Sequence, residues 1–280
     1  MTSLYVISDT HDDLEAVARA VDFAESEGRE GSRIIHLGDI ALRPYTRAAL
    51  EEFRASGDEA AFLEARRVHS EGVLTGLRSI LEGSGLPYFV LPGNYDGDIE
   101  PVLNGAVLHR RTDRIGEARI IGYGGADEFP GHIRLLKSLG DITTYKPGEV
   151  ARLIREEKPA IIALHKPPYG FCDVTRFGHS GEPMVTMALS PVVKLVLAGH
   201  VHDGMGVTRK GDTVIAHPGS LGRFELIGAE TLETKKELDF GTFMRVDVED
   251  DGTPTKVTHY SVKDESRLIG DVRMIAEASV

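Results

Sequence analysis

Short runs of apolar residues alternate with longer amphipathic stretches through most of the chain. The short runs are rich in Val, Ile and Leu without polar alternation, which is typical of strands covered on both faces. Stretches near 14–26 and 149–157 have the spacing and the first-turn residues of helices. This order predicts an α/β domain. The expected strands are Leu4–Ile7, Arg33–Leu37, Tyr88–Leu91, Ala160–Leu164 and Leu195–Ala198.

Two regions depart from this pattern. Between Pro44 and Gly83 the chain is charged, favours helix and repeats its apolar residues at helical spacing. We expect a surface helical hairpin there, with a lid or a dimer-forming element as the alternative. No repeat, low-complexity tract or linker is found, which predicts a single domain over residues 1–280. After Gly199 short strands are expected near 207–209, 213–216, 242–248 and 256–262, and residues 225–239 stay unassigned.

Polar side chains follow each of the five expected strands at the point where the strand ends. Open α/β sheets bind ligands just beyond the carboxyl ends of their strands, so these side chains should share one site. Glycines at 38, 93 and 199 let the backbone turn sharply beside it. Residues two apart can face one side of an extended segment, which applies to positions 9 and 11 and to 200 and 202. The candidate ligands are Asp9, His11, Asp39, Asn94, His165, His200 and His202.

Composition narrows the chemistry of this site. The chain has 11 His but one Cys, which excludes an intramolecular disulfide and a cysteine-rich zinc module. A donor set of oxygen and nitrogen suits Mn²⁺, Fe or Zn²⁺ better than Mg²⁺. Seven ligand-type residues exceed what one ion takes from protein, so two ions with a shared carboxylate are expected. Two ions about 3.5–4 Å apart can clamp a phosphoryl group and activate a bridging water.

Charge bears on the partners. With 32 Lys and Arg against 44 Asp and Glu, the formal net charge is −12, which argues against broad binding to duplex nucleic acid. Two divalent ions facing the carboxylates of Asp9 and Asp39 would still leave a local charge of 4 − 2 = +2, suited to a small anionic ester. No apolar stretch approaches the ~18 residues of a membrane span, and the first residues show no signal core. We therefore expect a cytoplasmic protein without a membrane partner, and no oligomeric state is predicted.

The ordered set Asp-x-His, Gly-Asp, Gly-Asn-x-Asp, His and Gly-His-x-His resembles the calcineurin-like metallophosphoesterase superfamily over about residues 4–220. The runs at 122–125, 165–170 and 217–220 look like its Icc-related branch, which usually has asparagine in place of His217. The resemblance implies an α/β fold, the four-layer α/β/β/α sandwich, here with a helical insertion near 44–83. It also implies that Asp9, His11 and His202 bind one metal, that Asn94, His165 and His200 bind the second, and that Asp39 bridges them.

The activity implied by the resemblance is that of a dinuclear metal-dependent phosphoesterase, with manganese favoured. In that mechanism a metal-bridging hydroxide attacks phosphorus in line, and the ions with the His and Asn contacts, Asn94 among them, stabilise charge on the phosphoryl oxygens. Asp39 is expected to be the most sensitive residue, since losing the bridge disturbs both ions. Most members carry histidine where this chain has Tyr95. That histidine assists at the leaving group. Tyrosine has a reference pKa of ~10 and is a poor general acid at neutral pH, but Tyr95 can still donate a hydrogen bond there. We therefore expect activity on phosphodiesters, or on monoesters with good leaving groups.

Two alternatives stay open. His179 lies where Icc-like relatives carry a histidine, so it could contact substrate or replace the missing acid. The protein would then be a phosphomonoesterase acting on nucleotides or phosphoproteins. A catalytically silent interaction module on the same fold is the alternative of another class, and the complete ligand set argues against it.

The remaining polar residues near these motifs are expected to be structural. Asp96 should hold its loop or orient a ligand histidine, and His36 should lie in the core. His217 is expected either to hold a metal ligand in place or to be a structural residue of its turn. Cys172 is expected to be inert, because the metal centre already supplies a nucleophile. His69, His109, His132 and His259 have no motif support, and specificity is expected to come from the 44–83 insertion and from residues 126–146 and 170–190.

Overall fold

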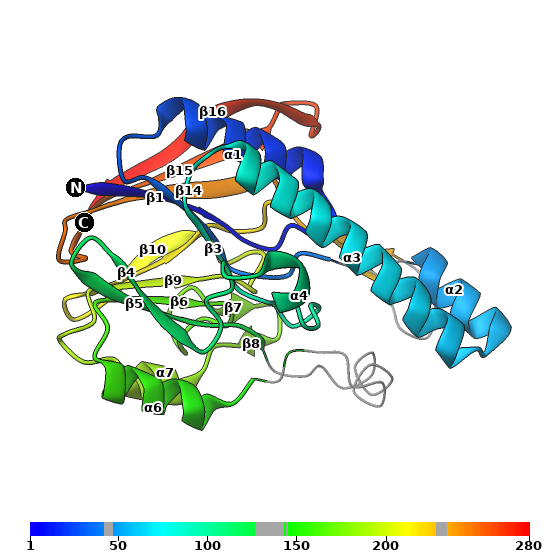
Figure 1. The fold of residues 1–280 in the computed structure, drawn as a ribbon, viewed down its shortest axis with the longest axis horizontal. Coiled ribbons are helices and arrows are strands. Elements are labelled where there is room, and N and C mark those ends of the chain that lie inside the picture. Colours follow the sequence, from blue (N-terminus) through cyan, green and yellow to red (C-terminus); the bar gives the residue numbers. More distant parts are fainter. Residues whose placement is uncertain (42–46, 127–142, 144, 228–233) are drawn as a thin grey trace.

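Two six-stranded sheets lie face to face between two layers of helices (Figure 1). The structure is a computed structural model, which describes residues 1–41, 47–126, 143, 145–227 and 234–280. Helices α1 (Leu14–Glu27) and α3 (Glu59–Gly83) cover the outer face of the first sheet. Helices α6 (Pro147–Glu157) and α7 (Pro183–Ala188) cover the outer face of the second. This arrangement is the four-layer α/β/β/α sandwich expected from the sequence.

The first sheet contains β1 (Thr2–Ile7), β2 (Arg33–His36), β3 (Tyr88–Val90), β14 (Thr242–Val248), β15 (Pro254–Lys263) and β16 (Ile269–Ser279). Its order is β16-β15-β14-β1-β2-β3, with β1, β2 and β3 parallel and the others antiparallel. Along β1, Tyr5 and Ile7 face the helices, whereas Leu4 and Val6 face the second sheet. Burial on both faces explains why the sequence of this strand does not alternate.

The second sheet contains β4 (Arg111–Ile115), β5 (Ala118–Tyr123), β6 (Ile161–Leu164), β9 (Leu195–Ala198), β10 (Gly206–Lys210) and β11 (Thr213–His217). Its order is β10-β11-β9-β6-β5-β4, and the four central strands are parallel. In β6, Ile161 and Ala163 enter the core between the sheets, while Ile162 and Leu164 pack toward α6 and α7. The parallel strands of both sheets therefore bring their carboxyl ends to one end of the sandwich.

The helical insertion forms as expected, but it is more than a surface hairpin. It consists of α2 (Arg47–Ser56) and α3, and its first part projects from the sandwich (Figure 1). In the second half of α3, Val73, Leu74 and Leu77 are buried in the same core cluster as α1. A Cβ at Gly76 would collide with Leu14, so glycine permits the close packing of the two helices. Residues 44–46 of the predicted insertion lie outside the described residues.

All five expected parallel strands form near their predicted bounds, and β10, β11, β14 and β15 match the later expectations. The strands β4, β5 and β16 were not expected. β4 and β16 are edge strands whose side chains are mostly exposed, so they carry little apolar pattern.

Short elements complete the described chain. They are α4 (Glu100–Leu103), the hairpin of β7 (Val174–Thr175) and β8 (Gly178–His179), and the hairpin of β12 (Glu225–Ile227) and β13 (Thr234–Glu237). The last hairpin falls in the polar stretch that the sequence left unassigned. Within the described ranges, no helix has both the length and the apolar character to cross a membrane.

Candidate metal centre

The candidate ligands lie together where parallel strands of both sheets end. Several of them sit on backbone with positive φ, including Asp9 (54°), Asp39 (56°) and His200 (72°). Such conformations cost a non-glycine residue roughly 1–2 kcal/mol and cluster at functional sites. The residues are Asp9 and His11 after β1, Asp39 after β2, Asn94 after β3, His165 after β6, and His200 and His202 after β9.

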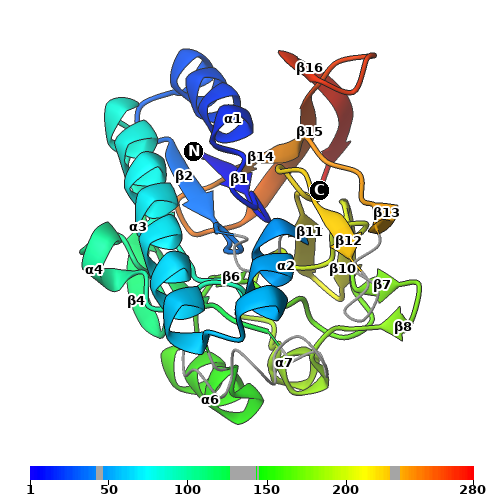
Figure 2. The ribbon, with the colours of Figure 1, turned by 90° about the vertical axis from the view of Figure 1, so that its right-hand side faces the viewer.

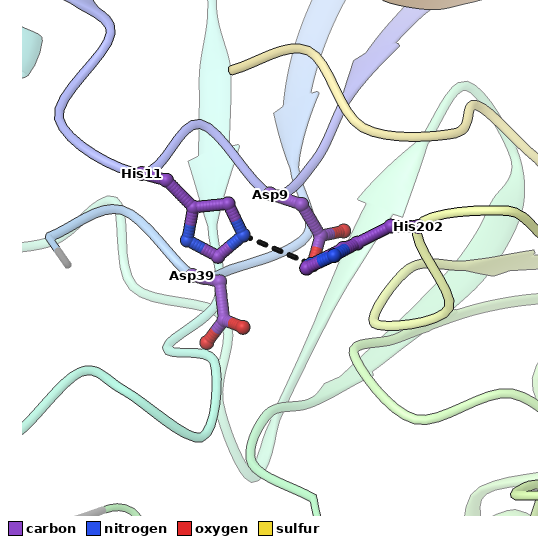
Figure 3. A group of neighbouring side chains, drawn as sticks. All are labelled: Asp9, His11, Asp39 and His202. Carbon is purple, nitrogen blue, oxygen red and sulfur yellow. Dashed lines mark hydrogen bonds and ion pairs between the residues drawn. The ribbon is translucent and has the colours of Figure 1, made fainter. Parts of the chain in front are cut away.

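Asp9, His11, Asp39 and His202 form a first group, in which one donor atom of each lies within 4.8 Å of the others (Figure 3). Nε2 of His11 is 2.9 Å from Nε2 of His202. The latter atom is 3.3 Å from Oδ1 of Asp9. Two imidazole nitrogens this close require a proton or a cation between them, because their lone pairs would otherwise repel.

Asp39, His165 and His200 form a second group of the same kind. Oδ1 of Asn94 joins it, at 3.0 Å from Nε2 of His165 and 2.9 Å from Nδ1 of His200. Nδ1–H of His165 donates to the Leu37 carbonyl at 2.9 Å, so Nε2 is the ring nitrogen directed into the group and would offer its lone pair when a metal ion displaces its proton. Asp39 is common to both groups, so it stands where a shared carboxylate would.

Each carboxylate has one oxygen held by the protein and one directed into the cluster. Oδ2 of Asp9 accepts from the Ser8 hydroxyl and the His200 N–H, and Oδ1 of Asp39 accepts from the Tyr95 N–H at 3.0 Å. The other oxygen of each is buried and has no hydrogen bond, only ion-pair contacts with histidine. Nδ1 of His11 is also buried and unpaired. Buried polar atoms without partners are costly, so this donor set fits bound cations.

The electrostatics of the cluster favour positive charge at its centre. Burial opposes ionisation of Asp9, yet the close contact with His202 and its charge hold the pKa of Asp9 well below the usual range. Burial lowers the pKa of His11 to about 4 and that of His200 to about 3, so both are neutral donors at pH 7. Burial also opposes the charge on His165, but Asp39 and Asp9 outweigh it and raise its pKa to about 9.

Asp96 connects the two turns that carry Asp39 and Asn94. Its carboxylate accepts from the N–H groups of Ile40 at 3.0 Å and Ala41 at 3.1 Å, beyond β2. It also accepts from the N–H of Gly93 at 2.7 Å, beyond β3. Burial and the nearby charge of Asp39 raise the pKa of Asp96 to about 6. Asp96 therefore holds its loop, which is one of the two roles expected for it.

Two buried histidines brace turns beside the cluster. Nδ1 of His36 accepts from the Gly38 N–H at 3.0 Å, and its Nε2 lies 3.1 Å from Oγ1 of Thr10. Nδ1 of His217 accepts from the Gly219 N–H at 3.0 Å, and its Nε2–H donates to the Gly199 carbonyl at 2.7 Å. Both ring nitrogens of each residue are engaged, so neither histidine offers a lone pair to a metal.

Glycines allow the ligand-bearing turns to meet. A Cβ at Gly93 would collide with Oδ1 of Asp39, and one at Gly199 would collide with Oγ of Ser8. Gly38 adopts a φ of 109°, which a residue with a side chain rarely adopts. Each of the three glycines expected to matter at the site is thus required by a contact or by its backbone conformation.

The two candidates for contact with the leaving group lie in different places. The ring of Tyr95 is 6.0 Å from that of His11, beside the first group. His179 belongs to the β7–β8 hairpin and to neither ligand group. Its Nδ1 is 2.7 Å from Oδ1 of Asp173, a fully buried carboxylate that also accepts from the Gly170 and Gly181 N–H groups.

The residues expected to be structural have local partners or are inert. Burial raises the pKa of Cys172 to about 11, which makes its thiol a poor nucleophile. Nδ1 of His109 accepts from the Gly124 N–H, and Nε2 of His69 is 3.0 Å from Oδ2 of Asp12. Nε2–H of His259 donates to the His217 carbonyl. His132 and most of the expected specificity segment 126–146 lie outside the described residues.

Two residues at the site were missed by sequence reasoning. The ring of Phe224 lies 4.8 Å from that of His11 and 4.7 Å from that of His202. Arg66 of α3 is only 1% exposed, and its guanidinium donates to the Tyr95 carbonyl at 2.8 Å. The sequence does hold an indication that Arg66 is buried, since it lies four residues after Phe62 on the apolar face of its helix. The sequence holds no such indication for Phe224, because the last recognisable motif before it ends at Ser220.

Comparison with solved structures shows the same fold at low sequence identity. The Thermus thermophilus protein TT1561 aligns with a TM-score of 0.51 and 18% identity, over 83% of this chain and 96% of its own. A dimetal phosphatase from Danio rerio aligns with a TM-score of 0.51 and 12% identity, over 98% of both chains. A further solved structure gives a TM-score of 0.58 and 19% identity, over 85% of this chain and 99% of its own.

Comparison with curated proteins gives no match. The family profile described as calcineurin-like phosphoesterase matches residues 2–204, which include every candidate metal ligand. The sequence motifs, the four-layer fold and the paired donor groups agree with this match. The chain therefore belongs to the calcineurin-like phosphoesterases.

Proposed function

We propose that the protein is a dinuclear metal-dependent phosphodiesterase that hydrolyses small phosphate esters. Asp9, His11 and His202 would hold one ion, and Asp39 would be shared between both. Asn94, His165 and His200 would hold the second ion. The observation that carries the dinuclear centre is the membership of Asp39 in both donor groups. The donors are carboxylate, amide and imidazole without thiolate, which suits Mn²⁺, Fe or Zn²⁺, and manganese is the metal that we favour.

Two divalent ions in this site would supply positive charge to a phosphoryl group and make water a better nucleophile near neutral pH. The chain's own contribution is to orient the donors before substrate arrives. The Ser8 hydroxyl and His200 N–H fix one oxygen of Asp9, and the Tyr95 N–H fixes one oxygen of Asp39. Each carboxylate is thus prevented from rotating, so its second oxygen stays directed into the site.

The preference for diesters rests on Tyr95. Its ring lies edge-on to His11, at an interplanar angle of 72°, in the place where most family members have histidine. A phenol can donate a hydrogen bond but is a weak proton donor near neutral pH. Monoesters with alkoxide leaving groups need that proton more than activated diesters do. The substrate would be a small anionic ester, such as a nucleotide. We also propose a cytoplasmic location, with which the single cysteine is compatible.

A comparison of an aryl diester with an aryl monoester tests this preference. With the Mn²⁺-reconstituted protein, kcat/KM for bis(p-nitrophenyl) phosphate should exceed that for p-nitrophenyl phosphate. A clear preference for the monoester would contradict the proposal. Metal analysis addresses the silent-module alternative, because fewer than one bound transition metal per chain after Mn²⁺ reconstitution would favour it.

A second candidate function, phosphomonoester hydrolysis, is favoured by one observation. The buried carboxylate of Asp173 holds Nδ1 of His179, so the tautomer and direction of this half-exposed imidazole are fixed. Carboxylate-oriented histidines are suited to general acid–base chemistry. The loop carrying Asp173 also approaches the His202 turn, since a Cβ at Gly204 would collide with the Cys172 carbonyl.

A further inference from the structure

The described residues of the metal centre differ in their exposure to solvent. Among the described residues of the cluster, Asp9, His11, Asp39, Asn94 and His165 are buried, and we call these five the floor. His200 and His202 are partly exposed. Tyr95 and Phe224, also partly exposed, lie beside the first donor group, and we call these two the rim aromatics. Among the described residues, these partly exposed ones are the part of the site that a substrate arriving from solvent can contact.

Phe224 is placed by direct attachment of its segment to the Asp9 turn. The Leu221 and Gly222 N–H groups donate to the Ser8 and Asp9 carbonyls, each at 3.0 Å. A Cβ at Gly222 would collide with the Thr10 carbonyl, so glycine is needed for this approach. Arg223 then pairs with Asp13 at 2.9 Å. The ring of Phe224 follows a segment that is held at three successive residues.

Tyr95 is fixed in a similar way from the other side. Its N–H donates to Asp39, and its carbonyl accepts from the buried guanidinium of Arg66 on α3. In Figure 2, α2 lies at the front of the molecule, with α3 on its left and the β12–β13 hairpin on its right. The segments that hold Tyr95 and Phe224 therefore come from opposite sides. The two rings nonetheless meet, with centroids 6.3 Å apart and planes inclined by 38°.

We propose that the rim aromatics Tyr95 and Phe224 form a subsite for a planar aromatic substituent of the phosphate ester. This inference rests on the proposed phosphoesterase function and names the class of substrate that the site would take. The rim aromatics are pre-positioned beside the donor groups and partly exposed, so they offer aromatic surface to a substrate held there. Aromatic surface favours planar groups over saturated groups of the same size. Any nucleobase or aryl ring satisfies this requirement, because each has a π face.

Two esters with one leaving group test the subsite. Phenyl p-nitrophenyl phosphate and cyclohexyl p-nitrophenyl phosphate both release p-nitrophenolate and retain a planar or a saturated six-carbon ring. Their kcat/KM ratio is divided by the ratio of their uncatalysed hydrolysis rates, which removes the difference in intrinsic reactivity. The parent protein should favour the phenyl ester in kcat/KM by about 3- to 10-fold. Phe224→Leu should bring this ratio close to 1, and Phe224→Trp, which keeps a planar face, should retain it.

Phe53→Leu is the matched control. Phe53 is also partly exposed and also packs on an aromatic ring, that of Phe62 at 4.7 Å, but it lies on α2. The Phe53→Leu variant should keep the phenyl-to-cyclohexyl ratio of kcat/KM at the parent value. If Phe224→Leu lowers activity on both esters equally, Phe224 only positions the His11 and His202 imidazoles, and the subsite is refuted. A parent ratio near 1 refutes it as well.

Binding without turnover separates this inference from the proposed function. Phenylphosphonate and cyclohexylphosphonate are titrated calorimetrically into the Mn²⁺-loaded protein and its Phe224→Leu variant. A phenyl preference that Phe224→Leu abolishes, without hydrolysis of either ester, supports the subsite and contradicts the esterase. Hydrolysis with equal binding of both phosphonates supports the esterase and refutes the subsite. Failure of both hydrolysis and binding refutes both.

Discussion

The floor of the metal centre and its rim aromatics are built in different ways. Floor residues follow parallel strands directly, and hydrogen bonds within neighbouring turns fix their side chains. The rim aromatics also depend on segments outside the parallel strands, because Tyr95 is held by α3 and Phe224 precedes the β12–β13 hairpin. The donor groups therefore lie in the core of the fold. We expect discrimination between substrates to depend on the segments that hold the rim aromatics.

The largest effect should come from the floor, at Asp39. Asp39→Ala removes the carboxylate that both donor groups share, so both ions should be lost or displaced. We expect metal content below one ion per chain and a loss of activity exceeding the roughly 10- to 100-fold typical of residues that only support a ligand. Metal analysis and kcat/KM for the aryl diester measure this.

Asp113→Ala is the control for Asp39→Ala, since Asp113 is an exposed carboxylate on β4. It should match the parent in both measurements. Full activity with two ions per chain in Asp39→Ala would show that the centre has been assigned wrongly and that floor and rim do not divide as described.

Asp96 tests whether the floor depends on its backbone turns. In the parent protein the two Asp96 carboxylate oxygens accept from the N–H groups of Ile40, Ala41 and Gly93. In Asp96→Asn an amide N–H₂ replaces one of these oxygens, so a donor faces a donor. The turns bearing Asp39 and Asn94 should loosen, and Mn²⁺ affinity should fall by roughly 10- to 100-fold. Titration with Mn²⁺ measures the affinity, with Asp113→Asn as the control. An unchanged affinity would mean that the floor is rigid without this carboxylate.

The floor could be predicted from the sequence because each of its residues has a local signal. An apolar run marks the strand, and the polar residue follows within a few positions, as for Asp9 and His165. The shared position of Asp39 came only from the family resemblance. The apolar runs likewise predicted the central strands, whereas β16 bears mostly exposed side chains and gave no comparable pattern.

Of the rim aromatics, Tyr95 stands in a motif that the sequence shows, but Phe224 and the support of Tyr95 by Arg66 could not be predicted in this way. Phe224 is placed by hydrogen bonds from its segment to Ser8 and Asp9, more than two hundred residues earlier in the chain. Burial of Arg66 depends on the Tyr95 carbonyl, which belongs to another turn. A charged residue on an apolar helix face indicates some buried partner, but the sequence does not say which. Long-range contacts decide these positions, and single-sequence patterns do not encode them.

Arg66 connects the insertion to the rim, so its loss should have an intermediate effect. Arg66→Met keeps an apolar stem on α3 but removes the donor to the Tyr95 carbonyl. Displacement of Tyr95, whose N–H also holds Asp39, should lower kcat by roughly 10-fold. Steady-state kinetics on the aryl diester measure this, and thermal unfolding shows whether the variant is folded at the assay temperature.

Arg67→Met is the matched control for Arg66→Met. Arg67 is the next residue on the same helix, and its side chain is exposed and pairs with Glu64 and Glu71. Its loss should leave kcat within about twofold, because exposed ion pairs contribute little. Equal effects of the two variants would mean that α3 acts on the site only through its general stability.

The smallest effect on the favoured reaction is expected at His179, outside both floor and rim. His179→Ala removes the imidazole that Asp173 orients, and kcat for the aryl diester should stay within about threefold, because p-nitrophenolate leaves without needing a proton. Alkyl monoester hydrolysis is the informative counterpart. If His179 is the surrogate acid, that activity should be substantial in the parent and fall by roughly 10²- to 10⁴-fold in the variant. If His179→Ala loses diester activity to the same extent as monoester activity, His179 acts on all substrates. The β7–β8 hairpin would then contribute to catalysis together with the floor, outside the rim aromatics.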